Sequence, residues 1–163
     1  MNKILLSLEH RIRSMPNFLG IDYGTKRIGL AWADELGIAL PIGAISGVDS
    51  ERCFPELREE VEKRKIDEFV IGFPLHMDGT EGMRVEEVNV FAERLSKEFG
   101  LPVHRIDERL TSLAAEESMG PKAKRKKIRE SGKIDATAAC LILKDFLNRN
   151  LDADHIQTGD LSG

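Results

Sequence analysis

A carboxylate, a glycine, a hydroxyl and two cations stand close together near the start of the chain, at Asp22, Gly24, Thr25, Lys26 and Arg27. The four residues before the carboxylate, Phe-Leu-Gly-Ile, are typical of a buried strand that would present Asp22 at its exposed end. Gly24 would let a phosphate or a metal ion approach the backbone closely. This combination suits a divalent metal that holds a phosphate. The alternative is a strand that ends in an ordinary Asp-x-Gly turn.

Two further acids could join Asp22. Glu108 follows the strand-like segment 103–106, and Asp135 opens the helical pattern 135–147. Active sites of α/β sheets gather at the carboxyl ends of parallel strands, where all three acids would converge. At ~4 Å, bare carboxylates repel by several kcal/mol, so we expect Mg²⁺ or Mn²⁺ between them, with two ions clamping a phosphodiester. The alternatives are a surface salt bridge for Glu108 and a helix-dipole partner for Asp135.

The apolar pattern predicts the elements that would position these acids. Three closely linked strands, at 18–22, 27–34 and 39–45, indicate an antiparallel meander. Further along, we expect helices at 54–61, 85–99, 111–119 and 135–147, and strands at 66–73 and 103–106. This order predicts an α/β fold with a mixed five-stranded sheet, three strands antiparallel and then two parallel, flanked by helices. We expect an N-terminal extension at 1–16, one domain at 17–150 and a polar, disordered tail at 151–163.

Composition restricts the class of protein. A chain of 163 residues with 41% apolar and 32% charged residues fits one globular domain. No apolar stretch approaches the roughly 20 residues of a membrane span. Cys53 and Cys140 lie far apart with no metal-type spacing, which predicts reduced, packed thiols and a cytoplasmic protein.

Positive charge is concentrated in one segment although the net charge is −4. Residues 122–133 carry seven cations and one acid, which indicates a contact with a polyanion. Within this segment, sequence-independent affinity would come from Lys124, Arg125, Lys126 and Lys127. The alternative is a solvated cluster of surface lysines. With one Trp and one Tyr, the chain shows no evident aromatic platform for bases, so we expect recognition by shape and phosphate geometry.

Four segments in this order resemble the YqgF/RuvX family: 19–31 (Leu-Gly-Ile-Asp-Tyr-Gly-Thr-Lys-Arg-Ile-Gly-Leu-Ala), 70–80, 107–112 (Asp-Glu-Arg-Leu-Thr-Ser) and 133–143 (Lys-Ile-Asp-Ala-Thr-Ala-Ala-Cys-Leu-Ile-Leu). The resemblance implies a ribonuclease H-like fold over about 18–148. Members of the family are described as Holliday junction resolvases and as nucleases that mature the 5′ end of the 16S rRNA precursor. By this resemblance, Asp22, Glu108 and Asp135 take the acidic positions of the metal site. Asp107 competes with Glu108, because adjacent strand residues point to opposite sides.

The resulting hypothesis is a metal-dependent endonuclease that hydrolyses phosphodiesters in structured nucleic acid, with precursor 16S rRNA as substrate. Substrate contacts would come from Gly24, Thr25, Lys26, Arg109 and Thr111 and from the basic segment. Ribosomal particles are possible further partners, and the chain could be a monomer or a homodimer. Two alternatives stay open, namely a Holliday junction resolvase and a non-catalytic nucleic-acid- or ribosome-binding protein. An actin-like phosphotransferase is disfavoured, since it would need a second phosphate motif and a second domain.

Overall fold

The computed structural model describes residues 15–73, 82–107 and 133–158, and the side chains of the last range from 135 to 150. Its elements are β1 (Phe18–Asp22), β2 (Arg27–Ala33), β3 (Ala39–Ser46), α2 (Cys53–Arg64), β4 (Glu68–Phe73), α3 (Met83–Phe99), β5 (Val103–Asp107) and α6 (Lys133–Thr158). The expected helix at 111–119, the loop at 74–81 and the basic segment lie outside the described residues. Within those residues, no helix is long and apolar enough to cross a membrane.

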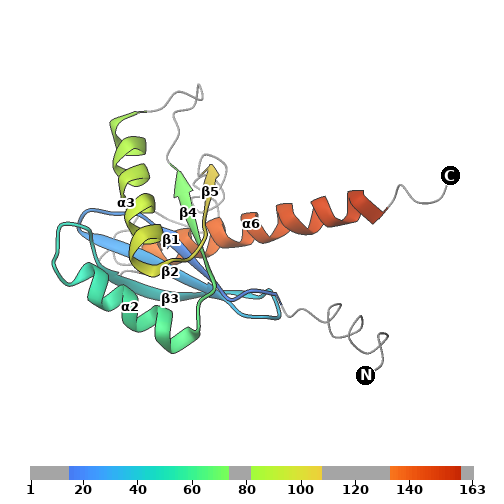
Figure 1. Cartoon of the computed structure of the whole chain (residues 1–163), viewed down its shortest axis with the longest axis horizontal. Coiled ribbons are helices and arrows are strands. Elements are labelled where there is room, and N and C mark those ends of the chain that lie inside the picture. The colour runs from blue at the N-terminus through green and yellow to red at the C-terminus, as the bar shows by residue number, and fades with distance from the viewer. Residues whose placement is uncertain (1–14, 74–81, 108–132, 159–163) are drawn as a thin grey trace, which may run out of the picture.

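The sheet has the predicted architecture. Its strand order is β3-β2-β1-β4-β5. The first three strands pair antiparallel, and β4 then pairs parallel to both β1 and β5. The carboxyl ends of β1, β4 and β5 therefore meet at one edge of the sheet, where Asp22 ends β1 (Figure 1).

Helices cover both faces of this sheet (Figure 1). Large side chains of β1 and β2, such as Leu19, Ile21 and Leu30, pack with α2 and α3 in one core cluster. Small residues alternate with them and face α6, among them Ala31 and Ala33. Because side chains alternate across a strand, one sequence pattern produces a bulky face and a flat face. The flat face lets α6 approach the sheet closely.

The close approach of α6 is clearest at Gly20. A Cβ atom there would lie 2.9 Å from the carbonyl oxygen of Ala139 and 3.0 Å from the Cβ of Leu143. Both distances are shorter than ordinary van der Waals contact. Glycine at this position is therefore a packing requirement that fixes the height of α6 above β1.

The last helix is longer than expected. It was predicted over 135–147, but it extends from Lys133 to Thr158 and so runs past residue 150, where we expected the domain to end. The reason is local, since the sequence contains neither glycine nor proline between Lys133 and Thr158. In Figure 1 the helix continues beyond the sheet.

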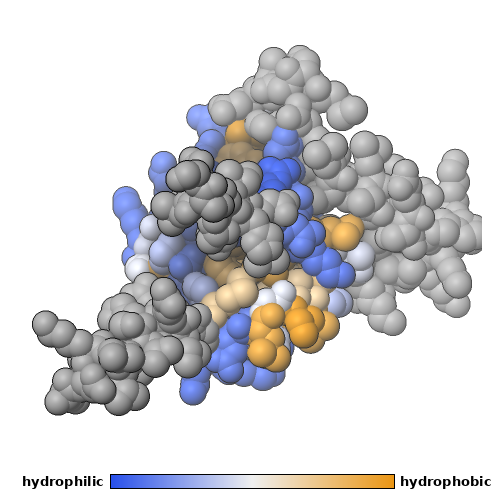
Figure 2. Space-filling model, turned by 90° about the vertical axis from the view of Figure 1, so that its right-hand side faces the viewer, coloured by the Kyte–Doolittle hydropathy of each residue, from blue (hydrophilic) through white to orange (hydrophobic). Residues whose placement is uncertain are grey.

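The exposed apolar surface includes the turn between β2 and β3. Leu36 is 73% exposed, and Ile38 and Leu40 are 57% and 50% exposed. Figure 2 shows apolar side chains gathered among hydrophilic ones on one part of the surface. This turn follows the end of β2 that is remote from Arg27, so it lies away from Asp22.

Candidate active site

Asp22 stands where β1 leaves the sheet. It is half-buried, and in the register between β1 and β2 it pairs with Gly29. The preceding Ile21 is fully buried and anchors the strand in the core. The backbone thus holds this carboxylate at the sheet edge where the parallel strands end.

Asp135 is brought to the same place by the start of α6. A Cβ atom on Gly29 would overlap the carbonyl oxygen of Asp135, so the first turn of α6 rests directly on the backbone of β2. Since Gly29 is also the register partner of Asp22, both acids lie beside one glycine. The fold therefore brings the backbones of two of the three predicted acids to the same place.

Asp135 has an incompletely satisfied carboxylate. Its Oδ2 atom is buried and has no hydrogen-bond partner. The Nε atom of Arg27 is 3.4 Å from this oxygen, close enough for an ion pair but without a hydrogen bond. A buried carboxylate oxygen needs a nearby cation, and in this structure Arg27 supplies it. A metal ion bound by Asp135 would share this carboxylate with Arg27 or replace it.

The turn between β1 and β2 is held by the loop that follows β3. Gly47 donates its backbone N–H to the carbonyl of Lys26, and Val48 and Asp49 donate to Gly24 and Thr25, at 2.9, 3.2 and 3.2 Å. A side chain on Gly24 would overlap the carbonyl of Arg27. Gly24 is therefore required by the turn itself, and its suggested contact with a phosphate stays a prediction.

A pocket of about 270 Å³ opens beside Asp135 and the residues that follow Asp22. Its lining combines the turn, the first turns of α3 and the start of α6, through Tyr23, Gly24, Thr25, Lys26, Arg27, Arg84, Glu87 and Asp135. Three cations line it, and among them the Lys26 side chain is 86% exposed. Its ammonium is 3.7 Å from Asp49, an exposed pair that leaves it available to an incoming anion. The pocket can receive a phosphate group next to the acids.

Arg84, Glu87 and Tyr23 belong to this pocket although the sequence analysis did not single them out. Arg84 donates a hydrogen bond to the carbonyl of Tyr23 at 3.2 Å, which joins α3 to the end of β1. Burial, and then the nearby charge of Glu87, raises the pKa of the Tyr23 phenol. The phenol is therefore a hydrogen-bond donor at neutral pH. No local signal marks Arg84 and Glu87, because they lie far from Asp22 in the chain.

The other predicted site residues are not placed. Glu108, Arg109, Thr111 and the four basic residues 124–127 lie outside the described residues. Asp107 ends β5 and pairs in register with Phe73 of β4, at the same edge as Asp22. Within residues 15–73, 82–107 and 135–150, no group of three potential metal ligands is found. The role of Glu108 as the third acid therefore remains a prediction.

Known proteins resemble the chain over most of its length. A relative from Opitutus terrae, named "Putative pre-16S rRNA nuclease", is 46% identical over 132 residues, which cover 80% of this chain and 90% of the relative. A protein of the same name from Streptococcus sanguinis is 40% identical over 135 residues, covering 81% and 97%. Such identity over most of both chains indicates common ancestry.

The fold is shared with a more distant enzyme. The structure of "T. thermophilus RuvC in complex with Holliday junction substrate" superposes with a TM-score of 0.50 and 12% identity, over 84% of this chain and 96% of that chain. At this identity the likeness concerns the fold alone, which is the ribonuclease H-like fold expected from the sequence. A family model described as "RuvX: Holliday junction resolvase" matches residues 16–149. Together with the relatives, this match shows that the chain belongs to the RuvX (YqgF) family.

Proposed function

We propose that the chain is a metal-dependent endonuclease that hydrolyses phosphodiesters in structured nucleic acid, and that its substrate is the 5′ region of precursor 16S rRNA. The observation that carries the proposal is the placement of Asp22 and Asp135 beside the same glycine, Gly29, next to a pocket lined by three cations. The names of the relatives from Opitutus and Streptococcus support the choice of substrate.

The acids would hold Mg²⁺ or Mn²⁺. Asp22 and Asp135, joined by Glu108, offer the hard oxygen ligands that these ions prefer. Two such ions, when bound, supply an activated water and neutralise charge on the phosphate and the leaving oxygen. Arg27 already pairs with Asp135, and metal ions would supply the further positive charge that a cluster of three acids requires.

The remaining residues of the pocket would bind and orient the substrate. The side chains of Lys26 and Arg84 and the hydroxyl of Thr25 line the space in front of Asp135. A phosphate there would be held by charge-assisted hydrogen bonds, which are stronger than neutral ones. Gly24 permits the tight turn, and Arg27 forms an ion pair with Asp135. Arg109, Thr111 and the basic segment 122–133 would add contacts to neighbouring phosphates.

A second candidate is cleavage of four-way DNA junctions. It is favoured by the description of the family and by the fold shared with the junction-bound RuvC. A junction resolvase must cut two strands symmetrically and is therefore expected to act as a two-fold dimer. A precursor rRNA can be cut by a monomer. A third possibility, a non-catalytic protein that binds nucleic acid or the ribosome, would share the basic segment but not metal-dependent turnover.

One experiment separates these functions. A labelled precursor rRNA fragment and a labelled four-way junction are incubated with Mg²⁺, Mn²⁺ or EDTA, using wild type, Asp22→Asn and Glu35→Gln. The last variant is a control at an exposed acid of the β2–β3 turn. We expect metal-dependent cleavage of the RNA that is lost in Asp22→Asn, while binding is retained or becomes tighter. Cleavage of the junction alone would favour the second candidate. Binding without cleavage under any metal would contradict the nuclease proposal.

A further inference from the structure

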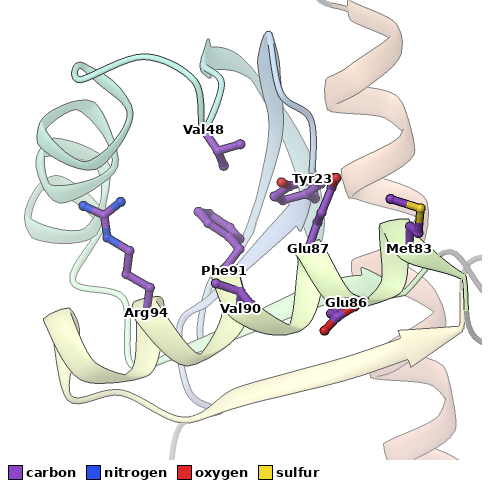
Figure 3. A pocket seen from close by; sticks show the side chains of 8 residues that line it. All are labelled: Tyr23, Val48, Met83, Glu86, Glu87, Val90, Phe91 and Arg94. Atoms are coloured by element: carbon purple, nitrogen blue, oxygen red, sulfur yellow. The ribbon is translucent and has the colours of Figure 1, made fainter.

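A second pocket adjoins the one in front of Asp135. It has a volume of about 450 Å³ and lies between α3 and the loop that follows β3 (Figure 3). Tyr23 and Glu87 line both pockets, so the two share a wall. A ligand whose phosphate occupies the first pocket therefore lies next to the second.

The second pocket has an apolar floor, in which Tyr23 and Phe91 are 7% and 5% exposed, and exposed apolar side chains at its edge. Figure 3 shows Val48 pointing from the loop toward Phe91, with Tyr23 beside it. The rings of Tyr23 and Phe91 lie 5.3 Å apart between centroids and are tilted by 60°. Val90 stands at the edge and is 63% exposed. Apolar walls around a few polar groups are typical of a site that binds a flat organic ligand.

The charges of this pocket differ from those of its neighbour. The first pocket contains three cations, Lys26, Arg27 and Arg84, beside its acids, whereas the second has Arg94 as its one cation and adds Glu86 to the shared Glu87. The one cation here, Arg94, is already engaged, because its Nε atom is 3.0 Å from Glu98 and its guanidinium lies 3.8 Å from the centroid of the Phe54 ring. Carboxylates disfavour a second phosphate, but they accept hydrogen bonds from amino and imino groups.

In a nucleic acid, the group attached next to a phosphate is a sugar with its base. We propose that the second pocket binds an unpaired nucleobase of the nucleotide adjoining the scissile phosphate. The inference rests on the proposed function, which places that phosphate in the first pocket. A base contributes a flat ring for the apolar walls and, on its edge, N–H donors for Glu86 or Glu87. A base that is paired in a duplex has its edge and both faces occupied, so the pocket selects a single-stranded or extruded nucleotide.

The test is a double-mutant cycle between the base and Val90. The cleavage position in the preferred substrate is mapped first, and abasic sites are then placed singly on either side of it. Wild type, Val90→Asn and Leu36→Asn are compared by kcat/KM in Mg²⁺. Leu36→Asn removes an apolar residue of similar exposure in the β2–β3 turn, away from both pockets. Thermal unfolding checks that both variants are folded.

We expect one of the two abasic sites to lower kcat/KM of wild type by ~5- to 100-fold, the range for loss of one stacked base. The same abasic site should matter much less in Val90→Asn and should keep its full effect in Leu36→Asn. If the intact substrate is cut and neither abasic site changes kcat/KM, or if the effect is equal in Val90→Asn, the base pocket is disproved and the nuclease function stands. If no substrate is cut with any metal, the proposed function and this inference both fail.

Discussion

The backbone of Asp135 rests on Gly29 so closely that no other residue type fits at position 29 without displacement. Gly29 is also the register partner of Asp22. This one glycine therefore determines how near the two carboxylates of the candidate site come to each other. The site depends on the absence of a side chain as much as on the presence of two acids.

The substitution Gly29→Ala should push the first turn of α6 away from β2. We expect a loss of ~1–3 kcal/mol in the free energy of unfolding, the usual cost of overpacking. The cleavage rate should fall by more than the loss of folded protein explains, because Asp135 would move relative to Asp22. Urea unfolding and cleavage rates well below the melting temperature measure the two effects.

The matched control for this prediction is Gly100→Ala at the end of α3. Gly100 has a φ of +64°, and nothing lies within 4 Å of the position of an added Cβ. Alanine there should cost about 1–2 kcal/mol through backbone strain and leave cleavage intact. If Gly29→Ala cleaves the substrate at the wild-type rate, the spacing of the two acids is not critical.

Binding of the metal should be visible as a gain in stability. A ligand that binds only the folded state stabilises it by about 2.7 kcal/mol at a hundredfold excess over Kd. We expect Mg²⁺ or Mn²⁺ to raise the melting temperature of wild type and of Glu35→Gln, but not that of Asp22→Asn or Asp135→Asn. Differential scanning calorimetry with added metal or EDTA makes the measurement without substrate. An equal rise in all four proteins would place the ion elsewhere.

Without metal, Asp135→Asn should change stability little. Its partner Arg27 is 42% exposed and the pair is long, so the ion pair is worth at most about 1 kcal/mol. A large loss of stability in EDTA would instead indicate that Asp135 is a structural residue.

The sequence predicted the mixed sheet because short connections join the first three strands and two further apolar strands follow, separated by a helix. It also placed Asp22 and Asp135 at one edge, since parallel strands and the helix that follows them share that edge. It could not predict the ion pair of Arg27 with Asp135, because a turn residue can point to either side. The sequence also could not predict which residues of α3 line the two pockets. Arg84, Val90 and Phe91 follow an ordinary helical pattern, and only the packing of α3 beside Tyr23 gives them a shared surface.

The buried thiols should make stability fall at high pH. Burial raises the pKa of Cys53 from the ordinary value of 9.0 to about 11, and it also raises the pKa of Cys140. Between about pH 9 and 11 the folded state therefore holds protons that the unfolded state has lost. The contribution of the protonated thiols to the free energy of unfolding is fully present below pH 9, and it is lost as pH rises through this window.

Urea unfolding between pH 8 and 11 tests this dependence. The decrease should be smaller in Cys53→Ala than in wild type, and the raised pKa values of Cys140 and Tyr23 account for what remains in the same direction. Val88→Ala removes buried apolar volume without a titrating group and should keep the wild-type slope. Equal slopes in Cys53→Ala and wild type would mean that the thiol does not govern the alkaline loss of stability.

The basic segment should control the salt dependence of substrate binding. Each phosphate contact that is removed lowers the slope of log K against log salt by ~0.7 for single strands and ~0.9 for duplex. We therefore expect alanine at Lys124, Arg125, Lys126 and Lys127 to weaken binding and flatten the slope by up to ~2.8 for single strands or ~3.6 for duplex. The control variant removes the same charge from α2 and the residue that follows it, and from α3 and α6, at Lys63, Lys65, Lys97 and Lys144. Net charge alone would affect both variants equally, whereas a direct contact affects only the first. An unchanged slope in the first variant would remove the basic segment from the interface.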